Sequence, residues 1–253
     1  MGADWVEIDT RGTGSRQEAP APCCNPLTKA AMPKPTRIKA ALFGDSGAYG
    51  SQGPGTDPVN ERLAIPPVVT LNTAQSRFDF RYDYSKPGAS WGKFFSPLQT
   101  ERAAAGLPDG IEFADLLLGT DAQAILFCMG GIDHGNLADL PAGVKRAAGL
   151  CQLASKAYAF VGVPEINATA SFAYQPHGTS FYDSLNLETT VAIASAAEML
   201  RQTCLHEAYP FVDVRNAIRI RDWTTVTGDM IHPTQAYSTA IFTRVARFIA
   251  GSP

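Results

Sequence analysis

The sequence predicts an α/β fold in which a central parallel sheet is covered by helices on both faces, a three-layer α/β/α sandwich. Short apolar runs at residues 38–43, 122–129 and 158–163 have the length and composition of buried strands. Each run is followed at once by glycine or proline, which are typical of turns. Segments with helical spacing separate the runs. Strands that alternate with helices favour a parallel sheet with both faces covered.

The elements follow one another in a regular order. The strand at 38–43 leads into a loop at 47–67 that is rich in glycine and proline. Residues 78–84 alternate aromatic with polar side chains, which predicts a half-exposed edge strand, and a turn at 87–91 leads into a helix. The remaining predicted elements are a helix at 111–118, a strand at 122–129, a helix at 141–157, a strand at 158–163, a helix at 187–205, a strand at 211–214 and a helix at 235–250.

Length and composition indicate one sizeable domain with an appendage. The chain has 253 residues, of which 45% are hydrophobic, and this supports a substantial core. Residues 1–36 contain five prolines at or after position 20, together with Gly12 and Gly14, which interrupt regular elements. We expect residues 1–36 to be an N-terminal extension or linker and residues 37–253 to be the folded domain.

Charge and cysteine usage argue against several classes of function. The net charge is −3 and there is no basic run, so nucleic-acid binding has little electrostatic support. No stretch approaches the roughly 20 apolar residues of a membrane-spanning helix. The five cysteines match no zinc or redox spacing, and the four histidines do not cluster as metal ligands. Residues 1–10 lack the apolar segment of a secretory signal.

A hydroxyl group stands at the carboxyl end of the first strand, in Gly44-Asp45-Ser46. Ligands of open α/β sheets bind at that end, and a serine there is a nucleophile if a base reaches it. Asp229 and His232 are three residues apart, so one carboxylate can orient an imidazole that takes the serine proton. An isolated Asp-x-x-His pair is most often a helix start with a surface histidine, and its pairing with Ser46 favours the catalytic interpretation.

Together these residues resemble the SGNH/GDSL hydrolase family of serine esterases. Gly44-Asp45-Ser46 is similar to the first block of that family, and Pro87-Gly88-Ala89-Ser90 is similar to the second. Gly130-Gly131-Ile132-Asp133 stands where the third block belongs, and Asp229-Met230-Ile231-His232 is similar to the fifth. The resemblance covers about residues 38–250 and depends on the order and spacing of the four blocks.

The resemblance implies a flavodoxin-like fold and a carboxylic ester hydrolase, an esterase or deacetylase. Ser46 would be the nucleophile, His232 the base and then the acid, and Asp229 the group that orients His232. The backbone N–H groups of Ser46 and Gly88 would stabilise the tetrahedral oxyanion. No metal or organic cofactor is implied.

The third block departs from the family pattern Gly-x-Asn-Asp, whose asparagine is an oxyanion donor. If Gly131 is the block glycine, Asp133 replaces that asparagine; if Gly130 is, Ile132 replaces it and Asp133 keeps the aspartate position. We favour the first register. An ionised Asp133 would repel an oxyanion, so this register predicts that Asp133→Asn raises turnover. Asn136, three residues further on, would be a substitute donor, and losing one such donor costs about 10²- to 10³-fold in turnover.

Two functions remain open on the sequence alone. The first is a serine hydrolase that cleaves short acyl esters, such as O-acetyl groups on carbohydrate, because the sequence shows no long apolar lid for lipid chains. Its partner would be a small acyl ester or an acetylated sugar. The alternative is a low-activity or inactive binding or structural module of a larger assembly. A secreted or extracellular location, including a phage-associated one, is favoured over the cytoplasm, and the oligomeric state is open.

Overall fold

A computed structural model describes residues 36–51, 62–93, 112–130, 133, 137–164, 187–215 and 232–251. Contacts between Cα atoms divide the chain between Thr36 and Arg37, and the fold described below is that of the unit Arg37–Pro253. Residues 1–35 lie outside the described part, so the extension expected at residues 1–36 stays a prediction.

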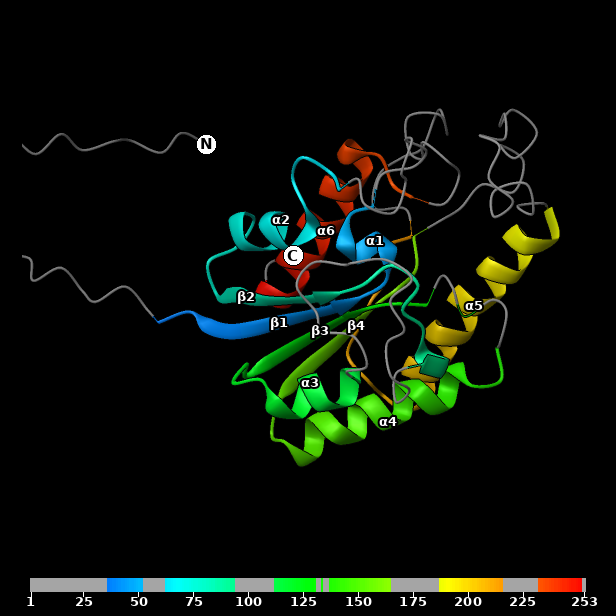
Figure 1. Ribbon diagram of the computed structural model, residues 1–253, viewed down its shortest axis with the longest axis horizontal. Coiled ribbons are helices and arrows are strands. Elements are labelled where there is room, and N and C mark those ends of the chain that lie inside the picture. Colours follow the sequence, from blue (N-terminus) through cyan, green and yellow to red (C-terminus); the bar gives the residue numbers. More distant parts are fainter. Residues whose placement is uncertain are drawn as a thin grey trace, which may run out of the picture. The chain divides into compact units, whose positions relative to one another are not determined.

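The described sheet is entirely parallel, as the alternation of strands and helices predicts. Its strands are ordered β2-β1-β3-β4-β5, and every pair of neighbours runs in the same direction (Figure 1). The strands are β1 (Ile38–Gly44), β2 (Phe78–Ser85), β3 (Ala124–Cys128), β4 (Ala157–Val161) and β5 (Phe211–Val212). Because β1 and β3 are central, their side chains face helices on both sides, which explains their continuous apolar sequence.

Strand β2 is the half-exposed edge strand that the alternating sequence predicts. It pairs only with β1 in the described sheet, and Phe80 is buried while Arg81 is exposed. The register between the two strands shifts between Ala40 and Ala41, whose partners are Phe80 and Tyr82. Arg81 is therefore the extra residue of a β-bulge, a feature that is common at sheet edges.

Helices cover both faces of the sheet and complete the three layers (Figure 1). One face packs against α1 (Ser46–Tyr49), α2 (Pro67–Thr73) and α6 (Gln235–Ala250). The other face packs against α3 (Phe113–Gly119), α4 (Leu140–Leu153) and α5 (Leu187–His206). None of the described helices combines the length and the apolar character that crossing a bilayer would require.

The core of the second face is aromatic. The rings of Phe127 and Phe160, on adjacent strands, stack with centroids 5.1 Å apart. Trp91 is 1% exposed and packs on both rings at 5.6 and 5.5 Å. Trp91 therefore belongs to the core. Cys128 and Cys151 are buried, as expected for small core residues.

Several element predictions need correction. Residues 47–49 of the predicted loop belong to helix α1. Helix α2 begins at Pro67, inside the segment predicted as a loop, because proline is well accommodated in the first turn of a helix. The helix expected after the turn at 87–91 is, in the described part, a 3₁₀ turn at Trp91–Lys93, called η1. Helix α4 ends at Leu153 and not at 157, because Ser155 adopts a positive φ of 52° and Ala157 starts β4.

Replacing Gly44 by alanine is expected to destabilise the protein by about 3 kcal/mol, the upper end for added volume in a packed core. A Cβ atom at this position would lie 2.1 Å from the Cβ of Ala48 and 2.9 Å from the carbonyl oxygen of Cys128. Helix α1 would therefore have to move away from β1. Urea unfolding followed by circular dichroism measures the effect.

The matched control is Gly149→Ala, because Gly149 is exposed within α4 and a Cβ there meets nothing within 4 Å. This change should raise the free energy of unfolding by up to about 1 kcal/mol through helix propensity. Equal stability of Gly44→Ala and the unmodified protein would contradict the close packing of α1 on β1.

Candidate active site

The candidate site lies where the parallel strands end. Ser46 follows β1, Met129 follows β3, and Gly162 follows β4, so these residues share the carboxyl rim of the sheet. This rim is the place where open α/β sheets bind ligands. Helix α1 stands at that end of β1 (Figure 1).

Ser46 is placed by a short capped helix. Asp45 is extended, with φ −92° and ψ −159°, and its carboxylate accepts a hydrogen bond from the Gly47 N–H at 2.9 Å. The Asp45 N–H donates to the Cys128 carbonyl at 3.1 Å, which ties this turn to β3. Ser46 is then the first residue of α1 and is 8% exposed. At that position its own N–H has no acceptor within the helix.

Gly88 occupies a type II β-turn. The Ala89 N–H donates to the Lys86 carbonyl at 3.1 Å, Pro87 is the second residue, and Gly88 has φ +80°. The Lys86 N–H donates to the Gly44 carbonyl at 2.8 Å, so the turn is attached two residues before Ser46. A Cβ on Gly88 would meet nothing within 4 Å, so glycine is needed here for its backbone angle.

His232 lies at the start of the last helix. It is 8% exposed and stands two residues before Thr234, the N-cap of α6, whose side chain accepts from the Tyr237 N–H. Gln235 accepts from the Ile65 N–H at 2.9 Å and donates to its carbonyl at 3.0 Å. This pair of bonds fixes the beginning of α6 against the segment that precedes α2.

One small cavity joins the segments that carry Ser46 and His232. Its volume is about 40 Å³, room for about one water molecule. Asp45, Gly47 and Ala48, from the early part of the domain's sequence, line this cavity together with Pro233, from its late part. The other lining residues come from the ends of β3 and β4 and from α6: Cys128, Met129, Val161, Gly162, Val163, Pro164, Ile241 and Phe242. The fold therefore brings the neighbours of both predicted catalytic residues together.

The carboxylate of Asp133 has different partners from those expected of an oxyanion donor. Its Oδ2 accepts from the Trp91 N–H at 3.0 Å and its Oδ1 accepts from the Gly92 N–H at 3.2 Å. Asp133 is 3% exposed. Because both oxygens are acceptors for backbone groups, the structure gives no support to Asp133 as an oxyanion donor. The sequence holds no signal for this contact, since any residue except proline supplies a backbone N–H.

Two other predicted site residues, Asp229 and Asn136, lie outside the described residues. Their roles stay predictions.

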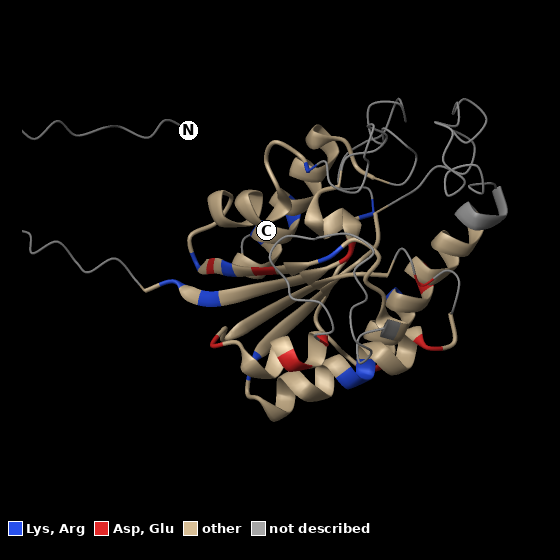
Figure 2. Ribbon diagram, viewed as in Figure 1, with Lys and Arg blue, Asp and Glu red and all other residues tan. Residues whose placement is uncertain are grey.

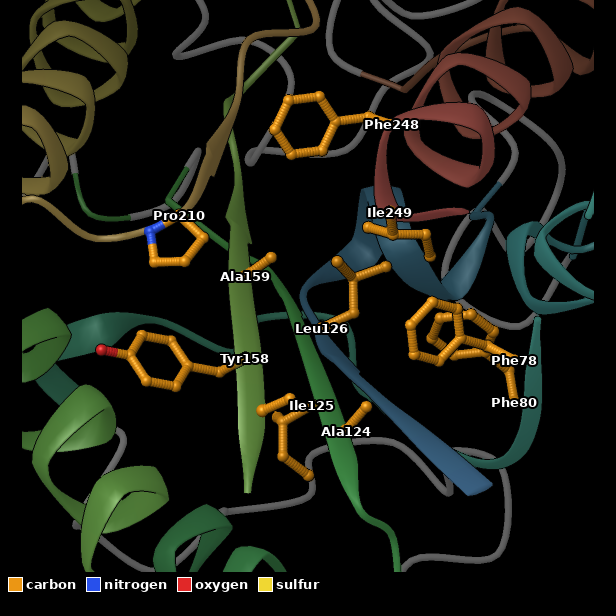
Figure 3. Close-up of a pocket in the computed structure, with 11 residues that line it drawn as sticks. Phe78, Phe80, Ala124, Ile125, Leu126, Tyr158, Ala159, Pro210, Phe248 and Ile249 are labelled. Atoms are coloured by element: carbon orange, nitrogen blue, oxygen red, sulfur yellow. The ribbon is translucent and has the colours of Figure 1, made fainter. Parts of the chain in front are cut away.

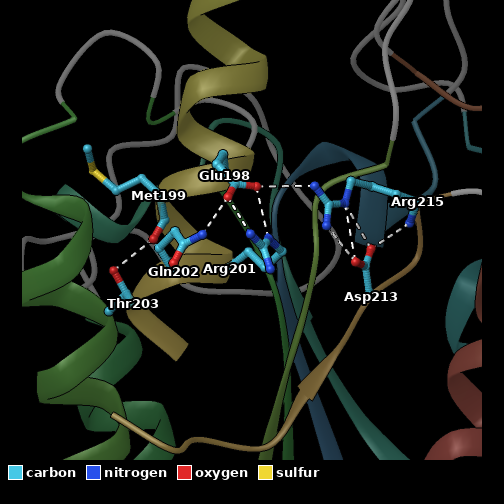
Figure 4. A network of polar contacts seen from close by, with 7 residues as sticks. All are labelled: Glu198, Met199, Arg201, Gln202, Thr203, Asp213 and Arg215. Carbon is cyan, nitrogen blue, oxygen red and sulfur yellow. Dashed lines mark hydrogen bonds and ion pairs between the residues drawn. The ribbon is translucent and has the colours of Figure 1, made fainter. Parts of the chain in front are cut away.

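A network of ion pairs secures the chain after β5 (Figure 4). Arg215 donates to Asp213 through Nε at 3.0 Å and Nη2 at 2.6 Å, and to Glu198 of α5 through Nη1 at 3.2 Å. Hydrogen bonds from Arg201 and then Gln202 lower the pKa of Glu198 to about 2. This network around Arg215 is not among the sequence-based predictions. An Asp-x-Arg pair directly after a strand was the available signal.

A larger cavity lies at the opposite rim, and none of the predicted site residues lines it. Its volume is about 220 Å³, and it is formed by the amino ends of β2, β3 and β4 with the last turn of α6 (Figure 3). Its lining is apolar except for Tyr158, whose hydroxyl accepts from Gln152 at 3.0 Å. This larger cavity therefore lies at the end of the sheet opposite the candidate nucleophile.

The described residues offer few other reactive groups. They contain no group of three His, Cys, Asp or Glu residues arranged to hold a metal ion. Burial raises the pKa of the Cys128 thiol well above its ordinary value, and it raises the pKa of Cys151 to about 12, so both thiols stay protonated. Figure 2 shows acidic and basic residues mixed over the described elements.

The fold and the residues at the carboxyl rim of the sheet define an α/β protein whose candidate nucleophile follows the first strand of a parallel sheet. Solved structures with this architecture include the aryl esterase of M. smegmatis, with a TM-score of 0.62 and 14% identity over 85% of this chain and 100% of that one. A carbohydrate acetylesterase from Sinorhizobium meliloti matches with a TM-score of 0.61 and 10% identity over 85% of this chain and 99% of that one. A candidate SGNH hydrolase from Slackia heliotrinireducens matches with a TM-score of 0.57 and 12% identity over 85% of this chain and 100% of that one.

The chain therefore has the SGNH/GDSL hydrolase fold, as the resemblance of its sequence blocks implies. At these identities the likeness concerns the fold alone. No protein-family model and no curated protein matches the chain.

Proposed function

We propose that this protein is a serine esterase that hydrolyses short acyl esters, such as O-acetyl groups on carbohydrate, through an acyl-enzyme. The observation that carries the proposal is the shared cavity, in which neighbours of Ser46 and of His232 meet at the carboxyl rim of the sheet. The names of the structural neighbours, an aryl esterase and a carbohydrate acetylesterase, agree with ester hydrolysis.

The proposed reaction has two halves. The Ser46 Oγ attacks the ester carbonyl carbon while His232, oriented by Asp229, takes the hydroxyl proton. The N–H groups of Ser46 and Gly88 stabilise the negative oxygen of the tetrahedral intermediate, and Asn136 is a further candidate donor. His232 then protonates the leaving alcohol, which leaves an acyl group on Ser46. In the second half, a water molecule gives a proton to His232 and attacks the acyl carbon. His232 returns the proton to the Ser46 oxygen as the carboxylic acid leaves.

The proposed preference for short acyl chains is based on the positions of the two described cavities. The described cavity beside the Ser46 segment is about 40 Å³, whereas the apolar cavity of about 220 Å³ lies at the opposite end of the strands. Among the described residues, a long acyl chain would therefore find little apolar space near the proposed nucleophile. We expect turnover of p-nitrophenyl esters to fall as the acyl chain grows beyond acetyl and butyryl.

Labelling with an organophosphonate ester tests the proposal. The reagent should add one phosphonyl group per chain, located on the peptide that contains Ser46, because the activated hydroxyl displaces the leaving group. Mass spectrometry of the intact and digested protein reads the result, and Ser46→Ala is the control that should stay unlabelled. An adduct on another serine, or no adduct together with no acetate release, would refute the proposed mechanism.

The alternative is an inactive or slow module with the same fold, and the contacts of Asp133 are the observation that favours it. Since both of its oxygens accept from backbone N–H groups, Asp133 does not supply the third donor that the family block normally provides. Turnover of p-nitrophenyl acetate and of an acetylated polysaccharide no faster than that of Ser46→Ala would favour this alternative.

A further inference from the structure

The loop that carries Gly88 is held from two sides. On one side the Lys86 N–H donates to the Gly44 carbonyl at 2.8 Å, which ties the loop to the strand that precedes Ser46. On the other side the N–H groups of Trp91 and Gly92 donate to the carboxylate of Asp133. The Gly88 turn lies between these two attachments.

Asp133 accepts from donors at the start of a helical turn. Trp91 and Gly92 are the first two residues of η1, and the first N–H groups of any helix lack an intrahelical partner. The carboxylate that accepts them belongs to a residue 42 positions after Trp91 and is 3% exposed. Bonds from backbone N–H groups to a buried charged acceptor are stronger than those between neutral groups.

The rest of this loop is anchored independently of Asp133. The indole Nε1 of Trp91 donates to the Met129 carbonyl at 3.3 Å, and its ring packs on Phe127 and Phe160. A Cβ on Gly143 would lie 2.5 Å from the Trp91 carbonyl oxygen, which shows how closely α4 approaches this backbone. Removing the carboxylate should therefore leave the loop in place but free its peptide planes to turn.

We propose that Asp133 is a positioning residue that orients the loop at residues 86–92 so that the Gly88 N–H points at the oxyanion. The inference depends on the proposed esterase function and replaces the earlier expectation that Asp133 faces the oxyanion itself. The amide side chain introduced by Asp133→Asn would keep one acceptor oxygen but present an NH₂ group to the second backbone donor. The predicted effect of this substitution thus has the opposite sign from the one that the sequence alone suggests.

Kinetics of Asp133→Asn and Asp133→Ala on p-nitrophenyl acetate test the inference. We expect kcat to fall about tenfold for Asn and about 10²-fold or more for Ala, because a misplaced donor weakens stabilisation of the transition state. The KM should change less than about threefold, since ground-state binding does not use the misplaced group. Asp115→Asn, an exposed aspartate in the first turn of α3, controls for the lost charge and should leave kcat unchanged.

Hydrogen exchange supplies a readout that does not depend on turnover. The amides of Trp91 and Gly92 should lose protection in both Asp133 variants, and in Asp115→Asn they should not. A higher kcat for Asp133→Asn would overturn the inference, and so would an unchanged kcat per folded molecule with only a lower Tm. If the unmodified protein neither turns over esters nor reacts with the phosphonate, the proposed function fails and the role of Asp133 fails with it. If the unmodified protein is active and both Asp133 variants have the same kcat as it has, the positioning role alone is refuted.

Discussion

Replacing Ser46 by alanine is expected to lower kcat on p-nitrophenyl acetate by about 10⁶-fold, the order of loss found when the catalytic serine of a serine hydrolase is removed. Without the hydroxyl no acyl-enzyme can form, and only the oxyanion donors and binding remain to assist water. The folded state should be kept, because Ser46 is a buried residue of a helix and alanine is the strongest helix former. Steady-state kinetics and thermal unfolding measure the two quantities.

The control for Ser46→Ala is Ser51→Ala. Ser51 is 2% exposed and its backbone N–H donates to the Ser46 carbonyl at 2.9 Å, a bond that alanine keeps. Its turnover should stay within about twofold of the unmodified protein, a change below about 0.5 kcal/mol in activation free energy. If Ser46→Ala retained more than about a tenth of the activity, another group would have to be the nucleophile.

His232→Ala is expected to cause a loss of the same order, and the double change with Ser46→Ala should be no slower than either single change. Groups that act as a unit show this lack of additivity, because the first removal already abolishes the step that both perform. The measurement is a double-mutant cycle on kcat. Losses that simply multiply would mean that the two residues act separately, despite the cavity that their neighbours share.

Added imidazole sharpens the test of His232. It should restore part of the activity of His232→Ala, because a free base can enter the space left by the side chain and take the Ser46 proton. It should restore none to Ser46→Ala. The matched control is His206→Ala, since His206 lies at the end of α5 with its side chain 83% exposed, and its kcat should not change.

Much of the fold was predictable because it follows from local patterns. The central strands are continuous apolar runs and the edge strand alternates, so their type and place could be read directly. Helix α2 was not predictable in this way, because the same Pro66-Pro67 pair that signals a loop also fits the start of a helix. The early end of α4 depends on Ser155 adopting a left-handed backbone conformation, which its residue type does not announce.

The sequence by itself determined the order of the strands, the parallel sheet, the helices that follow the third and later strands, and the placement of Ser46 directly after the first strand, because hydrophobic periodicity and turn residues act over a few positions. Only the tertiary structure decided that neighbours of Ser46 and His232 line one cavity and that Asp133 binds the loop at Trp91 and Gly92. These contacts join backbone and side-chain groups far apart in the chain. Backbone N–H groups are common to nearly all residues, so the sequence cannot show which of them a buried carboxylate will meet.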